Sequence, residues 1–360
     1  MALYDLAGSL YGPGSAGGAT GVGVPVGGVI AHPGPQPSGY APMAGQYLDL
    51  AQYPALTGVN DPPLGAVFTT RSVGASIYSV IKAGALYVAT GGAGVVRTSA
   101  DVVTWTTRTS GTSYNLYATA WSGALLVAVG NNGTLVTSAD GITWTARSSG
   151  TTQTLYSVTW SSARGLFVAV GSAGTLITSP DGITWTARSS GTTQTLNSVV
   201  WVAGLGLFVA VGSAGTLITS PDGITWTARS SGTTQTLQAI AWSGSELMAV
   251  GQNVACVSPD GITWTARSHT LGYMTLLTYA DGRWVAGVSM AYTASSDSGI
   301  TWSLPMSVGG TVAYQPLVEE AMVWLPSGTS LIGLPRSRPG YRYLPALSAA
   351  PGTTYYMRVA

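Results

Sequence analysis

The sequence predicts an all-β protein, and specifically a seven-bladed β-propeller. Only 8% of its 360 residues are charged, and Gly, Ser and Thr are abundant, so the composition typical of helices is missing. A tryptophan also opens equivalent segments about forty residues apart, a period typical of propellers and solenoids. These tryptophans are Trp105, Trp144, Trp185, Trp226, Trp264 and Trp302.

Each repeat contains four strand-like pieces, which predicts a four-stranded antiparallel meander. In one unit these are residues 157–160, 166–170, 175–178 and 184–188, all rich in Val, Ile, Thr and aromatic residues. Gly171, Ala173-Gly174 and Asp181-Gly182 separate them as tight turns. The second piece is apolar throughout, which favours a strand buried between neighbouring sheets, as in a propeller.

The turn between the third and fourth pieces repeats as Ser-x-Asp-Gly-x-Thr-Trp. Its Asp can accept backbone N–H bonds within the turn, Gly supplies a positive φ, and Trp fills the gap between adjacent sheets, so we predict structural roles. Val102 stands in the place of this Gly in the first copy, which leaves that turn's geometry open. The turns resemble the Asp box of sialidase-like, BNR-type propellers. The aspartates are Asp101, Asp140, Asp181, Asp222, Asp260 and Asp297.

Incomplete repeats at the two ends predict how the ring closes. Residues 68–71 match the fourth strand of a unit, yet three strands of the same unit do not precede them. Residues 311–336 offer three strand-like runs without an Asp box after them. We therefore expect the strand near Phe68 to complete the last blade, giving seven blades within residues 65–345. A six-bladed ring that leaves out residues 312–334 is the alternative.

The N-terminal residues 1–64 are dense in Gly and Pro and lack the tryptophan period. Residues 25–56 resemble the collar-type module of bacteriophage tail fibres, although Met43-Ala44 replaces the family's usual Cys-Asp or Cys-Asn. The match is carried by Pro25-Val26-Gly27, Ser38-Gly39-Tyr40, Gly45-Gln46 and Tyr53-Pro54-Ala55-Leu56. Residues 346–360 are predicted to form a C-terminal tail strand, in which residues 352–360 look like the closing strand of phage tail proteins.

This resemblance implies a virion component, a tail fibre or tail-tip protein made in the bacterial cytoplasm. Residues 1–64 would attach to other tail proteins, and fibres of this kind are commonly homotrimers.

The inventory of reactive side chains argues against an enzyme. A glycosidase needs paired carboxylates, but six of the ten Asp residues lie in the turns, and Glu246, Glu319 and Glu320 are the only glutamates. We predict no catalytic residues and no cofactor. His32 and His269 lack companions at metal-ligand spacing, so we predict no metal site. An arginine recurs at one fourth-strand position, where a ring of identical outer residues is expected. These are Arg71, Arg108, Arg147, Arg188, Arg229 and Arg267.

Charge and hydropathy exclude two further partners. The net charge is +1 and the chain has one Lys, which gives no basic patch for nucleic acid. Apolar runs are far shorter than the roughly 18 residues of a membrane span, so we expect no membrane insertion. Cys256 occupies a position that is Leu or Ile in other units, which favours a buried apolar role.

A binding surface remains, and we expect it at the mouth of the central channel. The loops that enter each innermost strand read SSGTTQTL, and the position directly after them varies between units. Tyrosines beside amides are a common chemistry for sugars; alternatively, the tyrosines only fill the channel. The candidate ligand-binding residues are Tyr78, Tyr117, Tyr156, Asn197 and Gln238.

We therefore expect a propeller that recognises a host-surface glycan or protein. A purely architectural tail protein is the rival hypothesis, and a glycoside hydrolase ranks below both.

Overall fold

The computed structural model describes residues 69–280 continuously and, elsewhere, a set of short strands. Side chains are described for residues 73–269, 272–279 and 284–287. The chain divides into two compact units, Thr69–Gly333 and the pair of segments Met1–Phe68 and Leu334–Ala360. The sequence analysis placed these boundaries after residues 64 and 345.

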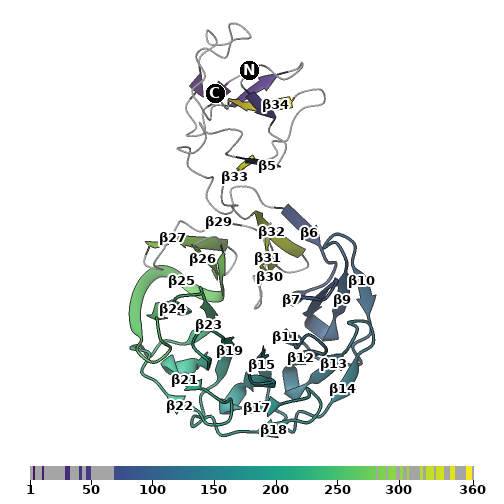
Figure 1. Ribbon diagram of the computed structural model, residues 1–360, viewed down its shortest axis with the longest axis vertical. Coiled ribbons are helices and arrows are strands. Elements are labelled where there is room, and N and C mark those ends of the chain that lie inside the picture. Colours follow the sequence, from purple (N-terminus) through teal and green to yellow (C-terminus); the bar gives the residue numbers. More distant parts are fainter. Residues whose placement is uncertain are drawn as a thin grey trace. The chain divides into compact units, whose positions relative to one another are not determined.

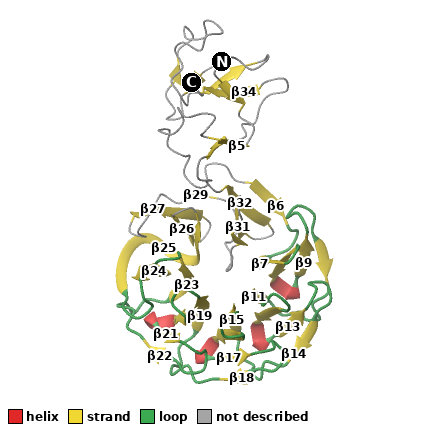
Figure 2. Ribbon diagram, in the orientation of Figure 1, coloured by secondary structure: helices red, strands yellow, loops and turns green. Residues whose placement is uncertain are grey.

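The sheets of the Thr69–Gly333 unit are arranged radially around a common centre, which makes this unit an all-β propeller (Figure 1). Short 3-10 turns are the helical elements of its described part (Figure 2). Four consecutive meanders, β7–β10, β11–β14, β15–β18 and β19–β22, each form a four-stranded antiparallel sheet.

The bounds of these meanders follow the repeat. The first strands are β7 (Ile77–Ala83), β11 (Leu116–Trp121), β15 (Leu155–Ser161) and β19 (Leu196–Val202). The second strands are β8 (Leu86–Gly91), β12 (Leu126–Gly130), β16 (Leu166–Gly171) and β20 (Leu207–Gly212). The third strands are β9 (Val96–Ser99), β13 (Leu135–Ser138), β17 (Leu176–Ser179) and β21 (Leu217–Ser220). The fourth strands are β10 (Thr106–Arg108), β14 (Thr145–Arg147), β18 (Thr186–Ala187) and β22 (Thr227–Ala228). The 3-10 turns η2 (Gly92–Gly94), η3 (Asn131–Gly133), η4 (Ser172–Gly174) and η5 (Ser213–Gly215) join second to third strands.

The next part of the chain departs from separate four-stranded sheets. Here β24 and β25 run through positions where the earlier units turn, so that β23–β29 form one seven-stranded sheet. The connection after Gly251 is shorter than in the earlier units, and the ladder continues with a register shift between Gln252 and Val254. The strands are β23 (Leu237–Trp242), β24 (Leu247–Ser258), β25 (Thr265–Ala280), β26 (Arg283–Val288), β27 (Ala291–Ser296), β28 (Thr301–Trp302) and β29 (Met306–Ser307).

An early strand and three late strands share one sheet, in the order β30-β31-β32-β6. Strands β32 and β6 pair antiparallel, with Leu331 opposite Arg71 and Ile332 opposite Thr70. Phe68, near which the closing strand was predicted, lies outside the described residues. The strands are β6 (Thr69–Ser72), β30 (Leu317–Val318), β31 (Met322–Ser327) and β32 (Ser330–Pro335).

The other unit combines strands from both ends of the chain. Strand β34 pairs with β3 and β4, and β33 pairs with β5, so residues predicted as a separate C-terminal strand share a sheet with N-terminal ones. Most of the collar-like motif residues lie outside the described part. The strands are β1 (Leu3–Tyr4), β2 (Leu10–Tyr11), β3 (Val29–His32), β4 (Tyr40–Pro42), β5 (Gln46–Asp49), β33 (Tyr341–Leu344) and β34 (Thr354–Arg358).

The core of the propeller lies between neighbouring sheets. In β12 every residue is buried, as expected for a strand sandwiched between sheets. Val127 and Val129 of β12 pack against Phe167 of the next sheet. Trp185 lies against the same Phe167, with ring centroids 6.2 Å apart, so the tryptophan fills the gap between sheets.

The Ser-Asp-Gly turns are held by their own carboxylates. Asp140 Oδ1 accepts the backbone N–H groups of Thr143 and Ile142, each at 2.8 Å, and the Ser138 hydroxyl at 3.0 Å. The first two bonds contribute most to holding the Asp140 pKa at about 2. Equivalent bonds occur at Asp101, Asp181, Asp222 and Asp260.

The first and the last of the six predicted turns depart from the shared sequence. Val102 adopts a φ of 61°, so the first turn keeps the bonds to Asp101 although it lacks Gly. Asp297 lies outside the described residues.

Within the part of the chain that the structure describes, we find no helix long and apolar enough to cross a membrane.

Candidate functional site

The five predicted binding positions share one backbone feature, a β-bulge near the start of each innermost strand. Tyr156 is the second residue of β15, and the register of β15 with β16 shifts between Leu155 and Ser157. The same shift surrounds Tyr78, Tyr117, Asn197 and Gln238 in β7, β11, β19 and β23. A bulged residue is unpaired in its ladder, which frees its side chain from the usual alternation. All five side chains are half-buried.

A glycine at the end of the second strand, or at the corresponding place within β24, permits this bulge. Ser172 N donates to Thr154 O at 2.9 Å, just before β15. A Cβ on Gly171 would lie 2.0 Å from that same oxygen. Equivalent glycines at positions 91, 130, 212 and 251 face the same obstacle, with a backbone oxygen 1.8–2.0 Å from the added Cβ. Glycine is therefore required here by close backbone approach rather than by φ, which is extended at −168° in Gly171.

Strand direction places these positions and the Asp turns at opposite ends of the sheets. Leu155, at the start of β15, pairs with Gly171, at the end of β16, so the loops and 3-10 turns share one end. The third strand then runs away to the Asp turn at the other end. The first strands lie nearest the centre of the ring (Figure 1). The bulged residues thus lie on the innermost strands at the loop-bearing end, and we call this end of the ring the channel mouth.

The three tyrosines contact one another from blade to blade, and each of the two amides bonds to the next innermost strand. The rings of Tyr78 and Tyr117 stack with centroids 5.4 Å apart, and Tyr117 and Tyr156 follow at 5.6 Å. Asn197 Nδ2 donates to Leu237 O at 2.9 Å, on the next innermost strand. Gln238 Nε2 donates to Tyr273 Oη at 2.6 Å. One side of the mouth is therefore aromatic and the other carries amides.

A cavity of about 240 Å³ lies against the innermost strands. Tyr156, Asn197 and Gln238 line it, whereas Tyr78 and Tyr117 do not. Thr275, which the sequence analysis missed, also lines it from the equivalent bulge of β25. Its Oγ1 is buried and finds no hydrogen-bond partner among the described residues. The sequence signal for Thr275 was its place directly after Met274, the counterpart of Leu237.

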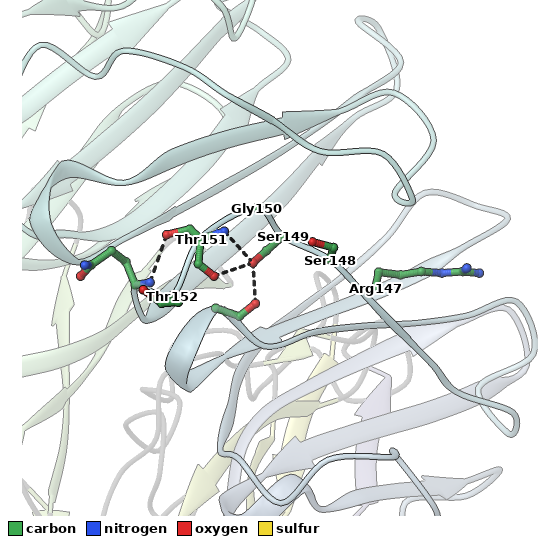
Figure 3. A pocket seen from close by; sticks show the side chains of 8 residues that line it. Arg147, Ser148, Ser149, Gly150, Thr151 and Thr152 are labelled. Carbon is green, nitrogen blue, oxygen red and sulfur yellow. Dashed lines mark hydrogen bonds between the residues drawn. The ribbon is translucent and has the colours of Figure 1, made fainter.

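The loops that enter the innermost strands are fixed by their own hydroxyl groups (Figure 3). Ser149 Oγ donates to Gly133 O at 2.6 Å, and Gln153 N donates to Thr151 Oγ1 at 3.0 Å. The same loop lines a shallow, open hollow together with Arg147, whose Nε donates to Thr137 Oγ1 at 3.1 Å. Hydrogen bonds within these loops therefore fix their conformation at the channel mouth without a ligand.

Two exposed tyrosines at this end were not among the predicted residues. Tyr114 is 47% exposed and Tyr273 is 38% exposed. Tyr114 stands where the three following loops carry Gln, and this departure from the repeat was the signal that could have identified it.

Within the described region, no group of three or more His, Cys, Asp and Glu side chains could hold a metal ion. Cys256 is fully buried, and this burial raises the pKa of its thiol to about 11, which keeps it protonated at neutral pH.

Comparison with known proteins identifies the fold. No protein-family model and no curated protein matches the sequence. Among solved structures, YCF48 from Cyanidioschyzon merolae is 17% identical, with a TM-score of 0.60 over 75% of this chain and 98% of that one. YCF48 bound to D1 peptide is 15% identical, with a TM-score of 0.62 over 78% and 99%. The WD40 repeats of RRP9 are 7% identical, with a TM-score of 0.63 over 77% and 99%. The chain therefore has a WD40-like β-propeller fold.

Proposed function

We propose that this chain is a structural component of a bacteriophage tail whose seven-bladed propeller recognises the host surface through its channel mouth. The observation that carries the proposal is the series of bulged positions Tyr78, Tyr117, Tyr156, Asn197 and Gln238. The backbone is nearly the same at each bulge while the side chain changes from Tyr to Asn to Gln. The surrounding positions, which build the fold, keep similar residue types from unit to unit. Aromatic faces beside amides suit a sugar, so a glycan is the favoured ligand.

The pairing of β32 with β6 supports seven blades. Together with β30 and β31 these strands supply a four-stranded sheet, in which an early strand completes a late blade. A ring closed in this way joins the two ends of the propeller, and its blades keep only short, protected sheet edges. The six-bladed alternative would leave this sheet outside the ring.

The phage-tail part of the proposal rests on the collar-like sequence of residues 25–56. By this resemblance, residues 1–64 attach the chain to other tail proteins, the assembly is a homotrimer, and the protein resides in the virion. The propeller fold is compatible with this role but does not select it, because one fold serves many functions.

Peptide recognition at the same mouth is the second candidate. It is favoured by the similarity to the structure described as YCF48 bound to D1 peptide. Thr275, from the equivalent position of β25, lines the same cavity as Tyr156, Asn197 and Gln238. An architectural protein without a ligand is the remaining rival, and we propose no enzymatic activity.

Adsorption of the full chain to a panel of bacterial cells tests the proposal. Tyr156→Asn is the informative variant because Asn197 occupies the equivalent position in β19, so the fold accommodates this residue. We expect adsorption to fall about tenfold, as for the loss of one aromatic contact, while circular dichroism shows that the fold is retained and the melting temperature falls only slightly, from the loss of the contact with Tyr117. Ile183→Ser is the matched control, because Ile183 is 45% exposed at the opposite end of the sheets.

Pretreatment of the cells identifies the ligand class. Loss of adsorption after periodate oxidation supports a glycan, and loss after protease supports a peptide. Adsorption to no strain of the panel, or equal adsorption of wild type and Tyr156→Asn, would contradict recognition at the channel mouth.

A further inference from the structure

The near-identical repeats reveal a second feature at the loop-bearing end. The loops before β15, β19 and β23 all read Ser-Ser-Gly-Thr-Thr-Gln-Thr, whereas the loop before β11 ends in Ser-Tyr-Asn. Turns η4 and η5 read Ser-Ala-Gly, whereas η3, in the sheet that follows this loop, reads Asn-Asn-Gly. Among these four loops and three turns, exchanges between Ser and Thr aside, the departures are an aromatic residue and three amides, all at one junction; η2 differs from η4 and η5 only by Gly92 in place of Ser. They are Tyr114, Asn115, Asn131 and Asn132.

These four residues lie together. Asn132 Nδ2 donates to Tyr114 Oη at 3.4 Å, which joins the loop to η3. Asn115 Oδ1 accepts Ala93 N at 2.9 Å, and its Nδ2 donates to Tyr117 Oη at 3.4 Å. Asn115 thus connects the group to the stacked tyrosines of the channel mouth.

The fold does not require the new side chains. Asn132 has a φ of 55°, and its counterparts Ala173 and Ala214 have φ values of 52° and 54°, so the turn is the same with Ala. Gln153 occupies the place of Tyr114 in a loop with the same serine and threonine hydrogen bonds. Tyr114 is 47% exposed, and Asn132 is also exposed. Tyrosine is enriched at recognition surfaces, because its ring offers an apolar face and its hydroxyl a hydrogen bond.

We infer that Tyr114 and the amides of Asn131 and Asn132 form a subsite for one neutral pyranose unit of a host-surface glycan. The apolar face of the sugar stacks on the phenol ring, and its hydroxyl groups bond to the amides. None of the four residues is charged, which favours a neutral sugar over an acidic one. This inference rests on the proposed function and specifies its ligand class.

A glycan array that contains neutral and acidic bacterial polysaccharides tests the subsite with the full chain. The variants Tyr114→Gln and Asn132→Ala restore the residues of the sister repeats, so we expect both to fold. Asn132→Ala should lower the melting temperature slightly, because Asn tolerates the left-handed φ of 55° better than Ala does. Each should lower the affinity for a neutral glycan about tenfold, the order expected for one lost aromatic or hydrogen-bonding contact. Gln194→Ala, in a loop with the unaltered sequence, is the control that should bind like wild type.

A transplant provides the converse test. Gln153→Tyr combined with Ser172→Asn and Ala173→Asn copies the arrangement one blade further, and we expect tighter binding to the same glycan through a second subsite. Full affinity in both Tyr114→Gln and Asn132→Ala, or binding to acidic glycans alone, would overturn the subsite. Adsorption to cells without binding to any neutral glycan would overturn the subsite while leaving host recognition intact. Absence of adsorption to every strain would instead refute the proposed function.

Discussion

Substituting Gly171 by Ala probes the bulge on which the channel mouth depends. The φ of Gly171 is −168°, an extended value that alanine adopts without strain. Its added Cβ, however, would lie 2.0 Å from Thr154 O and 3.0 Å from Leu155 Cα. These are backbone atoms, which cannot rotate away as a side chain could, so β15 and β16 must separate.

The expected cost follows from what this separation breaks. Inserting a methyl group into a packed site costs about 1–3 kcal/mol. The bond from Ser172 N to Thr154 O, 2.9 Å long, contributes about 1 kcal/mol. We therefore expect the variant to lose about 2–4 kcal/mol of unfolding free energy, which for a domain of this size lowers the melting temperature by roughly 10 °C.

Circular dichroism during thermal unfolding measures this loss, and Gly191→Ala is the control. Gly191 has a φ of +72° and no atom within 4 Å of an added Cβ, so alanine there meets backbone strain alone, about 1–2 kcal/mol. Adsorption to cells is measured in parallel for Gly171→Ala and Tyr156→Asn. The first variant loses the bulge and the second loses only the side chain, so the comparison distinguishes the two effects. Equal melting temperatures for Gly171→Ala and Gly191→Ala would refute the argument from close backbone approach.

Three further predictions concern the turns and the core. The pKa values of Asp140 and Asp260 are lowered to about 2, chiefly by bonds from the backbone N–H groups of Thr143 and Ile142 and of Thr263 and Ile262. The contribution of these carboxylates to protein stability is therefore complete above their ordinary pKa of 3.8 and is lost as the pH falls through about 2. Melting temperatures recorded from pH 7 to pH 2 should stay level to about pH 4 and then fall, whereas a flat profile down to pH 2 would contradict this role. Val102→Gly relieves left-handed strain of about 1–2 kcal/mol but loses a buried side chain that contributes about 1.5–3 kcal/mol, so the urea midpoint of unfolding should drop slightly. Gly223→Ala, whose Cβ would lie 2.6 Å from Leu166 Cδ2, should lower the midpoint more. A larger drop for Val102→Gly than for Gly223→Ala would contradict this comparison of strain with burial. Cys256 should stay unmodified by a thiol reagent in the folded protein and react on unfolding, because burial raises its pKa to about 11; rapid labelling of the native protein would show that the strand is accessible.

The repeat made much of the propeller predictable. The pieces predicted at residues 166–170 and 175–178 correspond to β16 (Leu166–Gly171) and β17 (Leu176–Ser179). Their apolar runs and glycine turns are local signals, and the burial of β16 follows from them. The continuous strands β24 and β25 were not predicted. They form because the connection after Gly251 is short and the ladder between the two strands continues past it, and the spacing of the tryptophans does not indicate this pairing.

The candidate site was predictable only in part. Tyr117 and Tyr156 were identified as variable positions, but their bulge depends on the approach of a glycine from a neighbouring strand. Their stacking joins residues from different sheets, and it depends on how those sheets pack. Thr275 was missed because the loop before it departs from the repeat, and Tyr114 because its exposure appears only in three dimensions.

Hydrogen exchange of the full chain, with and without surface polysaccharide from a bacterium to which it adsorbs, tests the location of binding most directly. Recognition at the channel mouth predicts that the ligand slows exchange in residues 112–118, 153–158 and 194–199 and leaves the Asp turns at residues 138–144 and 179–185 unchanged. Protection confined to the Asp turns, or spread equally over both ends of the sheets, would contradict it.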